Sequence, residues 1–126
     1  MPTYAYELDD ENAPEVFLPS VPGFSYGAAH ASELQYLFGL RAGFPAVLSP
    51  PQQRLASAMK RYWTSFADRG SPGSPGGSRG PAALDGPRWP LLESTSQQVL
   101  SLVPPRPQVE TGFAAEHHCA FWALAG

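Results

Sequence analysis

The sequence is poor in cysteine, in basic charge and in long apolar runs, and each shortage excludes a class of protein. Cys119 is the only cysteine among 126 residues, so no disulfide can form within the chain. The 8 Lys and Arg residues form no dense run and are outnumbered by 11 Asp and Glu, which argues against nucleic acid or an anionic membrane as a partner. No stretch approaches the roughly 20 apolar residues that span a bilayer, and the N-terminus lacks a secretion signal. We expect a cytoplasmic protein, subject to any secretion signal that upstream sequence adds.

Proline and glycine are abundant instead, with 15 and 12 residues. Both residue types favour turns and loops over long regular elements. Hydrophobic residues make up 43% of the chain, which supplies a core, and the length is that of one domain or part of one. The composition therefore predicts short elements joined by loops and disfavours an all-helical bundle.

Hydrophobic periodicity and capping residues predict where the regular elements lie. The expected elements are strands at 3–8, 99–103 and 109–113, and helices at 31–39, 49–70 and 114–123. The long helix has the clearest start, because Ser49 at the N-cap and Gln52 three residues later form a capping-box pattern. With so few strands, little is left to pair the first one.

Two segments are expected to lack regular structure. Residues 13–26 contain three prolines and are interpreted as a long ordered loop, which offers Phe17, Leu18 and Phe24 for packing. Residues 71–88 are rich in Pro, Gly and Ser, so ordering them would bury little apolar surface against the entropy lost. They are predicted to form a flexible insert.

One histidine, His30, stands in a loop of small residues directly before the short helix. The segment is Tyr26-Gly-Ala-Ala-His-Ala-Ser-Glu33-Leu-Gln-Tyr-Leu-Phe-Gly. Small neighbours let the backbone pass close to a substrate and leave the imidazole free to face a serine oxygen, as a general base requires. Glu33 lies in the first helical turn and is predicted to support this loop. The alternative is a loop histidine hydrogen-bonded to backbone.

This segment resembles the histidine motif of type-B carboxylesterases and cholinesterase-like proteins, a glycine-small-x-His-x-x-Glu-Leu-x-Tyr/Phe pattern. The resemblance extends to the Tyr-Ala-Tyr-Glu-Leu-Asp strand, to Arg61-Tyr-Trp in the long helix, to Trp89-Pro and to Cys119-Ala-Phe-Trp, whereas the insert matches poorly. It implies an α/β fold, with residues 1–126 as the C-terminal portion of an α/β-hydrolase domain. It also implies hydrolysis of a small-molecule carboxylic ester by a Ser, Glu/Asp and His triad, without metal or organic cofactor. His30 would be the triad histidine.

The chain order of that triad implies that the serine and the acidic member precede this chain. The isolated chain is therefore expected to be inactive, and to need upstream sequence or a separately encoded N-terminal half-chain. A hypothesis of a different class is a non-enzymatic interaction module, whose exposed sheet edge and helix face bind a partner chain.

Two clusters imitate catalytic or metal-binding motifs. Ser25 and Ser78 lie in G-x-S-x-G patterns, but neither has the strand before it and the helix after it that a nucleophile elbow requires. The adjacent residues His117, His118 and Cys119 cannot surround one metal ion tetrahedrally. We expect them to be solvated terminal residues.

Two further clusters are interpreted as structural. Asp9, Asp10 and Glu11 lack the alternating ligands and the glycine of a calcium loop, so a turn that ends the first strand is expected. The aromatic residues Tyr62, Trp63 and Phe66 are predicted to be core, since no basic groove accompanies them as in a platform for nucleic-acid bases.

Overall fold

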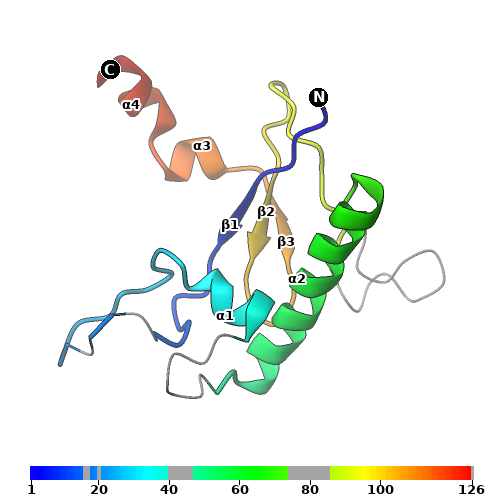
Figure 1. Ribbon diagram of the computed structural model, residues 1–126. Helices are drawn as coiled ribbons and strands as arrows, with labels where there is room; N and C mark the ends of the chain where they lie inside the picture. The colour runs from blue at the N-terminus through cyan, green and yellow to red at the C-terminus, as the bar shows by residue number, and fades with distance from the viewer. Residues whose placement is uncertain (16–17, 20, 40–46, 74–85, 126) are drawn as a thin grey trace.

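The computed structural model describes residues 1–15, 18–19, 21–39, 47–73 and 86–125, and it shows a three-stranded sheet with helices α1 and α2 beside it (Figure 1). The strands are β1 (Tyr6–Leu8), β2 (Val99–Leu102) and β3 (Gln108–Glu110), and the helices are α1 (Glu33–Phe38), α2 (Pro50–Arg69), α3 (Phe113–Glu116) and α4 (Cys119–Ala125). The expected elements are present, most of them shorter than expected, and the expected terminal helix is divided in two and extends to Ala125. None of the helices in these described ranges is both long and apolar enough to cross a membrane.

The first strand has a partner that the sequence did not predict. β1 pairs in parallel with β2, with Tyr6 opposite Leu100, and β2 pairs antiparallel with β3. Parallel strands need a long crossover connection, and here α1 and α2 lie within it. The expectation that little would pair this strand is wrong, because an extended apolar pattern carries no information about a partner at the far end of the chain.

Helix α2 begins and ends where the sequence predicts. At its start the backbone N–H of Ser49 donates to the side-chain oxygen of Gln52 at 2.8 Å, as a capping box requires. At its end Gly70 adopts φ 68° and donates its N–H to the Phe66 carbonyl at 2.8 Å. Glycine takes this left-handed conformation without steric cost, so the helix stops there.

The core lies between β2, α1 and α2. Its fully buried large side chains are Tyr36 of α1, Leu55, Met59 and Tyr62 of α2, and Leu100 and Leu102 of β2. Trp89 adds a ring at 5.4 Å from the Tyr62 ring, and its indole N–H donates to the Ala5 carbonyl at 2.9 Å. The one polar group of this indole is therefore satisfied inside the core.

The outer part of the predicted aromatic core is not buried. Trp63 is half-buried, and Phe66 is 49% exposed. The Trp63 ring lies 5.0 Å from the Tyr6 ring and 5.1 Å from the Trp89 ring, whereas the Phe66 ring lies 6.0 Å from the Tyr4 ring, as measured between centroids. The prediction is correct for Tyr62 and wrong for Phe66, because within the described ranges the N-terminal segment covers one side of the Phe66 ring and leaves the other open.

Helices α3 and α4 project away from the sheet (Figure 1). The single helix expected over 114–123 is interrupted at His118, which has φ 51°. His117 is exposed, as expected for a solvated residue. Its Nε2 also lies 2.9 Å from Oε1 of Glu7, and this contact ties the end of α3 to the first strand.

The insert expected at 71–88 is described only at its two ends, since 74–85 lie outside the described residues. The Trp89 N–H donates to the Gly73 carbonyl at 2.9 Å. The Tyr62 hydroxyl donates to the Pro87 carbonyl. The two ends of the insert are therefore held side by side against α2.

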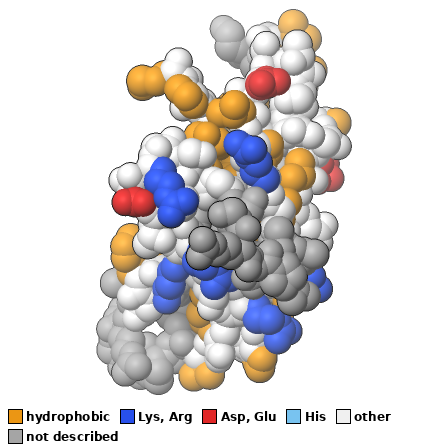
Figure 2. Space-filling model, turned by 90° about the vertical axis from the view of Figure 1, so that its right-hand side faces the viewer, with side chains coloured by type: hydrophobic (Ala, Val, Ile, Leu, Met, Phe, Trp, Pro, Cys, Tyr) orange, Lys and Arg blue, Asp and Glu red, His pale blue; other side chains and the backbone are white. Residues whose placement is uncertain are grey.

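Basic side chains are spread over the face that α2 presents outward (Figure 2). A cleft of about 440 Å³ on α2 is lined by Arg54 and Arg61, and Arg106 from the β2–β3 connection lies across it. These arginines are separated in the sequence and become neighbours only in the folded chain, so the sequence shows no dense basic run.

We expect Leu55→Ala to lower the free energy of unfolding by about 3 kcal/mol, because a fully buried leucine would lose its apolar contacts and leave a cavity. Denaturant unfolding followed by tryptophan fluorescence measures this change. Lys60→Ala, at an exposed position of the same helix, is the matched control and should change stability by less than about 0.5 kcal/mol. Equal effects of the two substitutions would contradict the packing of α2.

Candidate functional site

His30 lies at the corner of a tight turn directly before α1. The Ser32 N–H donates to the Ala29 carbonyl at 3.1 Å, and Ala31 adopts φ 70°. A positive φ at the third residue is what a type II turn requires, and glycine is the usual residue there. An alanine in this conformation is strained by about 1–2 kcal/mol. Strain of this kind is held by the surrounding structure and clusters at functional sites.

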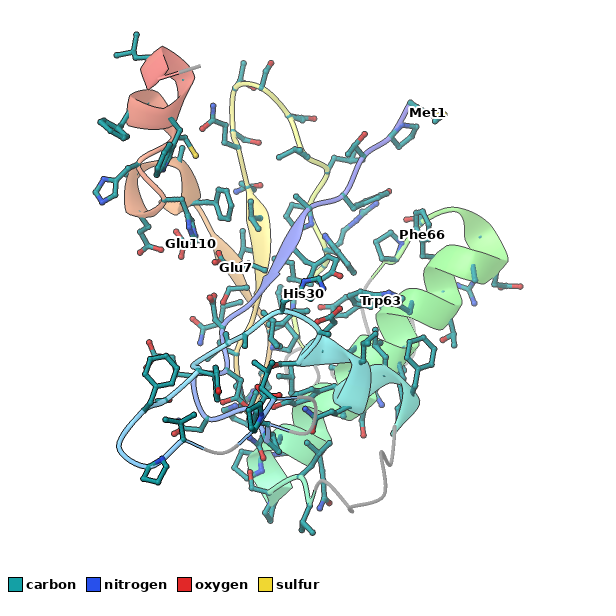
Figure 3. The ribbon with its side chains drawn as sticks, turned by 60° about the vertical axis from the view of Figure 1, so that its left-hand side comes forward. Met1, Glu7, His30, Trp63, Phe66 and Glu110 are labelled. Carbon is teal, nitrogen blue, oxygen red and sulfur yellow. The ribbon has the colours of Figure 1, made fainter. Side chains whose placement is uncertain are left out.

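The imidazole of His30 is exposed. Figure 3 shows it beside β1, between the labelled side chains of Glu7 and Trp63. Within the described ranges no hydrogen bond or ion pair holds the ring, so the alternative of a histidine bonded to backbone gains no support there. An accessible imidazole is what a general base for an external hydroxyl requires.

Glu33 begins α1, where its charge is favourable at the positive end of the helix. No hydrogen bond joins it to His30 in the described part of the chain. Its carboxylate acts on Tyr6 instead, because the pKa of that phenol is raised first by burial and second by the negative charge of Glu33. The support that Glu33 was expected to give the histidine loop stays a prediction.

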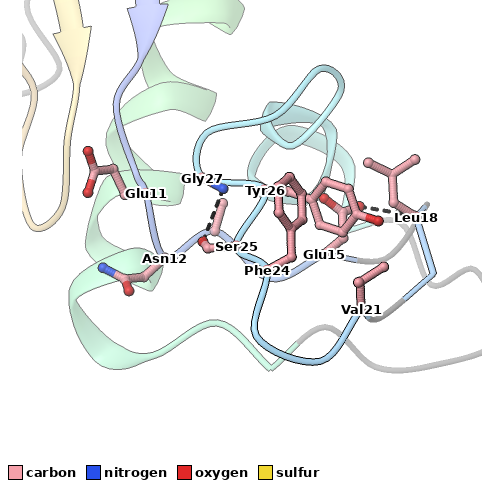
Figure 4. A pocket seen from close by; sticks show the side chains of 10 residues that line it. Glu11, Asn12, Glu15, Leu18, Val21, Phe24, Ser25, Tyr26 and Gly27 are labelled. Atoms are coloured by element: carbon pink, nitrogen blue, oxygen red, sulfur yellow. Dashed lines mark hydrogen bonds between the residues drawn. The ribbon is translucent and has the colours of Figure 1, made fainter.

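Two clefts flank the loop that leads to His30. The larger, about 700 Å³, is lined by the acidic residues Glu11 and Glu15 and by the rings of Phe24 and Tyr26, which meet edge-on at 5.0 Å (Figure 4). The second, about 650 Å³, extends from Glu7 of the first strand and Asp9 directly after it to Ala28. His30 lines neither of these two clefts, although both reach within three residues of it.

The other candidate residues are placed as follows. Ser25 accepts the Gly27 N–H at 3.2 Å in its own turn, and no strand leads into it among the described residues, so the elbow geometry is not met. Ser78 lies outside the described residues. His118 and Cys119 are exposed, and the described ranges contain no group of three side chains that could hold a metal ion.

The carboxylate of Asp10 is buried, which the sequence pattern did not predict. This residue is 4% exposed and accepts hydrogen bonds from the Tyr36 hydroxyl, from Gln52 Nε2 at 2.8 Å and from the Asn12 N–H at 3.0 Å. Only a turn that ends the first strand was expected here, and acidic residues are rarely buried. Its partners Tyr36 and Gln52 lie on two helices far along the chain, so no local pattern could reveal the burial of Asp10.

The environment of Asp10 also alters its tyrosine partner. Burial raises the pKa of Tyr36 far above its usual range, and the hydrogen bond to the Asp10 carboxylate raises it further. The phenol therefore stays protonated and remains a donor. The neighbouring Asp9 serves the sheet, since its carboxylate accepts the Ser101 hydroxyl and its N–H donates to the Leu102 carbonyl at 3.2 Å.

Solved esterase structures share this arrangement of strands and helices. The TM-score is 0.62 with a thermophilic pNB esterase and with a carboxylesterase of Geobacillus stearothermophilus, at 22% and 23% identity. The matches cover 92% and 93% of this chain and 21% of each esterase. The expected α/β class is confirmed, and the chain has the fold of a portion of an α/β-hydrolase.

The sequence comparison defines the family. Residues 1–122 match the carboxylesterase family, and the chain belongs to it, which confirms the family resemblance. The acetylcholinesterase of Bungarus fasciatus is 27% identical over 119 residues, which are 94% of this chain and 18% of that protein. The bile salt-activated lipase of Homo sapiens is 36% identical over 70 residues, which are 56% of this chain and 9% of that protein. The chain thus spans a fifth or less of these relatives' length.

The strain at Ala31 predicts an unusual response to glycine. Ala31→Gly should raise the free energy of unfolding by up to about 1 kcal/mol, because relief of the left-handed strain outweighs the extra flexibility of the unfolded chain. Ala29→Gly, two residues earlier in the same turn, lacks that strain and should lower stability by about 0.4–1 kcal/mol. Denaturant titration measures both, and equal losses would contradict the turn geometry.

Alkaline titration tests the burial of Tyr36 and Tyr62. Burial is the first cause that raises the pKa of both phenols above the usual 10.0. Above that pH the unfolded chain loses these protons while the folded chain keeps them, so stability is full below pH 10.0 and falls as the pH rises further. The free energy of unfolding measured against pH should fall less steeply in Tyr36→Phe and Tyr62→Phe. Unchanged slopes in both variants would contradict the burial of the phenols.

Proposed function

We propose that this chain is the histidine-bearing portion of a carboxylic-ester hydrolase, in which His30 is the general base for a serine outside these 126 residues. The observation that carries the proposal is the exposed imidazole on a strained turn, in a chain of the carboxylesterase family. The family match supports the reaction class, and the turn supports the role of this residue.

The proposed reaction proceeds through an acyl-enzyme. His30 accepts the serine proton as the serine oxygen attacks the ester carbonyl, and it returns that proton to the departing alcohol. A water molecule then attacks the acyl group with the same assistance, which releases the carboxylic acid and restores the serine. The acidic triad member and the donors to the oxyanion are also proposed to come from outside this chain. The small residues Gly27, Ala28 and Ala29 leave room for the substrate beside the imidazole.

A second candidate function is binding without catalysis, and exposed apolar side chains favour it. Phe38 is 67% exposed, Phe66 49% and Trp122 66%. Exposed apolar surface of this kind marks interaction sites. In the ester hydrolase the rest of the enzyme would cover this surface, whereas in a binding module a different partner chain would.

Alone, the chain should give no burst of product with an activated ester such as a p-nitrophenyl ester, because the nucleophile is missing. Stopped-flow absorbance measures the burst. Ser25→Ala and His30→Ala are the informative variants. A burst that both substitutions abolish would assign the nucleophile to Ser25 and overturn the proposal.

The positive test supplies the missing part. Co-expression with upstream sequence, or with a separately encoded chain that carries a G-E-S-x-G elbow and an acidic triad member, should give esterase activity. His30→Gln should then lower kcat by about 10³-fold or more, since removal of one triad member disables the triad. His118→Gln, at an exposed histidine outside the site, is the matched control and should leave kcat unchanged. A complex that forms and is unaffected by His30→Gln would leave the binding module as the better function.

A further inference from the structure

Two buried side chains of α1 reach back to the segment that follows β1. The Tyr36 hydroxyl donates to the Asp10 carboxylate, and the Gln35 side-chain amide donates to the Pro14 carbonyl. Tyr36 is 0% exposed, Gln35 2% and Asp10 4%. These contacts close the chain between residues 10 and 36 into a loop, and His30 lies within that loop.

Gln52 connects the same carboxylate to α2. Its Nε2 donates to Asp10 Oδ2 at 2.8 Å and to the Asn12 carbonyl at 2.9 Å, while its oxygen accepts the Ser49 N–H at 2.8 Å. One amide therefore caps a 20-residue helix and also holds the segment after β1. We call the set Asp10, Pro14, Gln35, Tyr36 and Gln52 the Asp10 clamp.

The clamp is sensitive to the loss of any one donor. Asp10 accepts hydrogen bonds from three neutral donors, which are a phenol, a side-chain amide and a backbone N–H. A buried carboxylate is tolerated only while its oxygens are hydrogen-bonded. Removing one donor leaves one lone pair of the buried carboxylate without a hydrogen bond. The other hydrogen bonds of the clamp are then weakened, because they belong to the same network.

The His30 turn depends on this clamp for its place in the fold. Its own hydrogen bonds are local, from the Ser32 N–H to Ala29 and from the Leu34 N–H to Ala31, and they fix its shape but not its position relative to β1. The clamp fixes α1, which begins three residues after the histidine. A general base must lie within hydrogen-bond reach of the hydroxyl that it serves, so its position decides the rate.

We infer that Asp10 is a positioning residue: through Tyr36 it fixes α1, and with α1 the His30 turn, at the end of the first strand, while Gln52 ties the same carboxylate to α2. The inference rests on the proposed function of His30 as a general base. The residues that line the larger cleft also lie between positions 10 and 36, within the same closed loop.

Hydrogen exchange on the 126-residue chain tests the clamp without reference to catalysis. Tyr36→Phe keeps the ring in the core but removes the hydroxyl, and Asp10→Asn removes the charge. Both should accelerate exchange of the Ser32 and Leu34 amides by about tenfold more than that of the β2 amides, because the turn is released locally. Leu100→Val, in the core of β2 outside the clamp, is the matched control for lost stability. Acceleration spread evenly over the chain in all three variants would overturn the inference.

Kinetics of the assembled esterase test the positioning role. Tyr36→Phe and Asp10→Asn should each lower kcat about tenfold or more while KM stays within about twofold, because a displaced base slows the chemistry more than the binding. The double variant should lose little more than either single one, since both remove the same clamp. Leu100→Val should keep the parental kcat. If the clamp variants lost activity only because they are less stable, this control variant would lose activity as well.

The two proposals fail in different ways. If His30→Gln leaves activity intact, the role of the histidine is wrong, whatever the clamp variants do. If His30→Gln abolishes activity and both clamp variants keep the parental kcat, the esterase role holds and the inference about Asp10 is wrong.

Discussion

The buried carboxylate of Asp10 is the point on which the elements around His30 depend. It follows the first strand and binds α1 through Tyr36 and α2 through Gln52. A buried carboxylate is stable only when its oxygens are hydrogen-bonded. Asp10 therefore needs both partners in position, and the position of each helix depends on that of the other. The first strand, both helices and the connecting loop are therefore all joined at Asp10. The exposed His30 turn lies on the loop that the Asp10 contacts close.

Membership of the carboxylesterase family gives this geometry a chemical context. The chain spans 18% of one relative and 21% of the esterase structures that it matches, so most of such an enzyme lies outside these residues. The pattern of exposure agrees with the proposal that further elements cover this chain. Phe38 and Phe66 are large apolar side chains on the two helices that flank the sheet, and Tyr6 on β1 is 42% exposed.

Local chemistry was predictable from the sequence, whereas contacts between distant segments were not. Ser49, Gln52 and Gly70 fix the ends of α2 by rules that act within four residues, and the structure confirms them. The pairing of β1 with β2, the burial of Asp10 and the contact of Glu7 with His117 join segments far apart in the chain. Periodicity shows that a residue faces inward, but not what it meets there. The motif could therefore single out His30 as a candidate, but not the buried contacts of Asp10 on the same loop.

The joined ends of the insert after α2 have a further consequence. Because the Gly73 carbonyl accepts the Trp89 N–H at 2.9 Å, the chain leaves and re-enters the folded body at adjacent points. The entropic cost of closing a loop grows only slowly with its length. The core consequently places little restriction on how many residues intervene, and this position suits the insertion of a fluorescent reporter or an affinity tag.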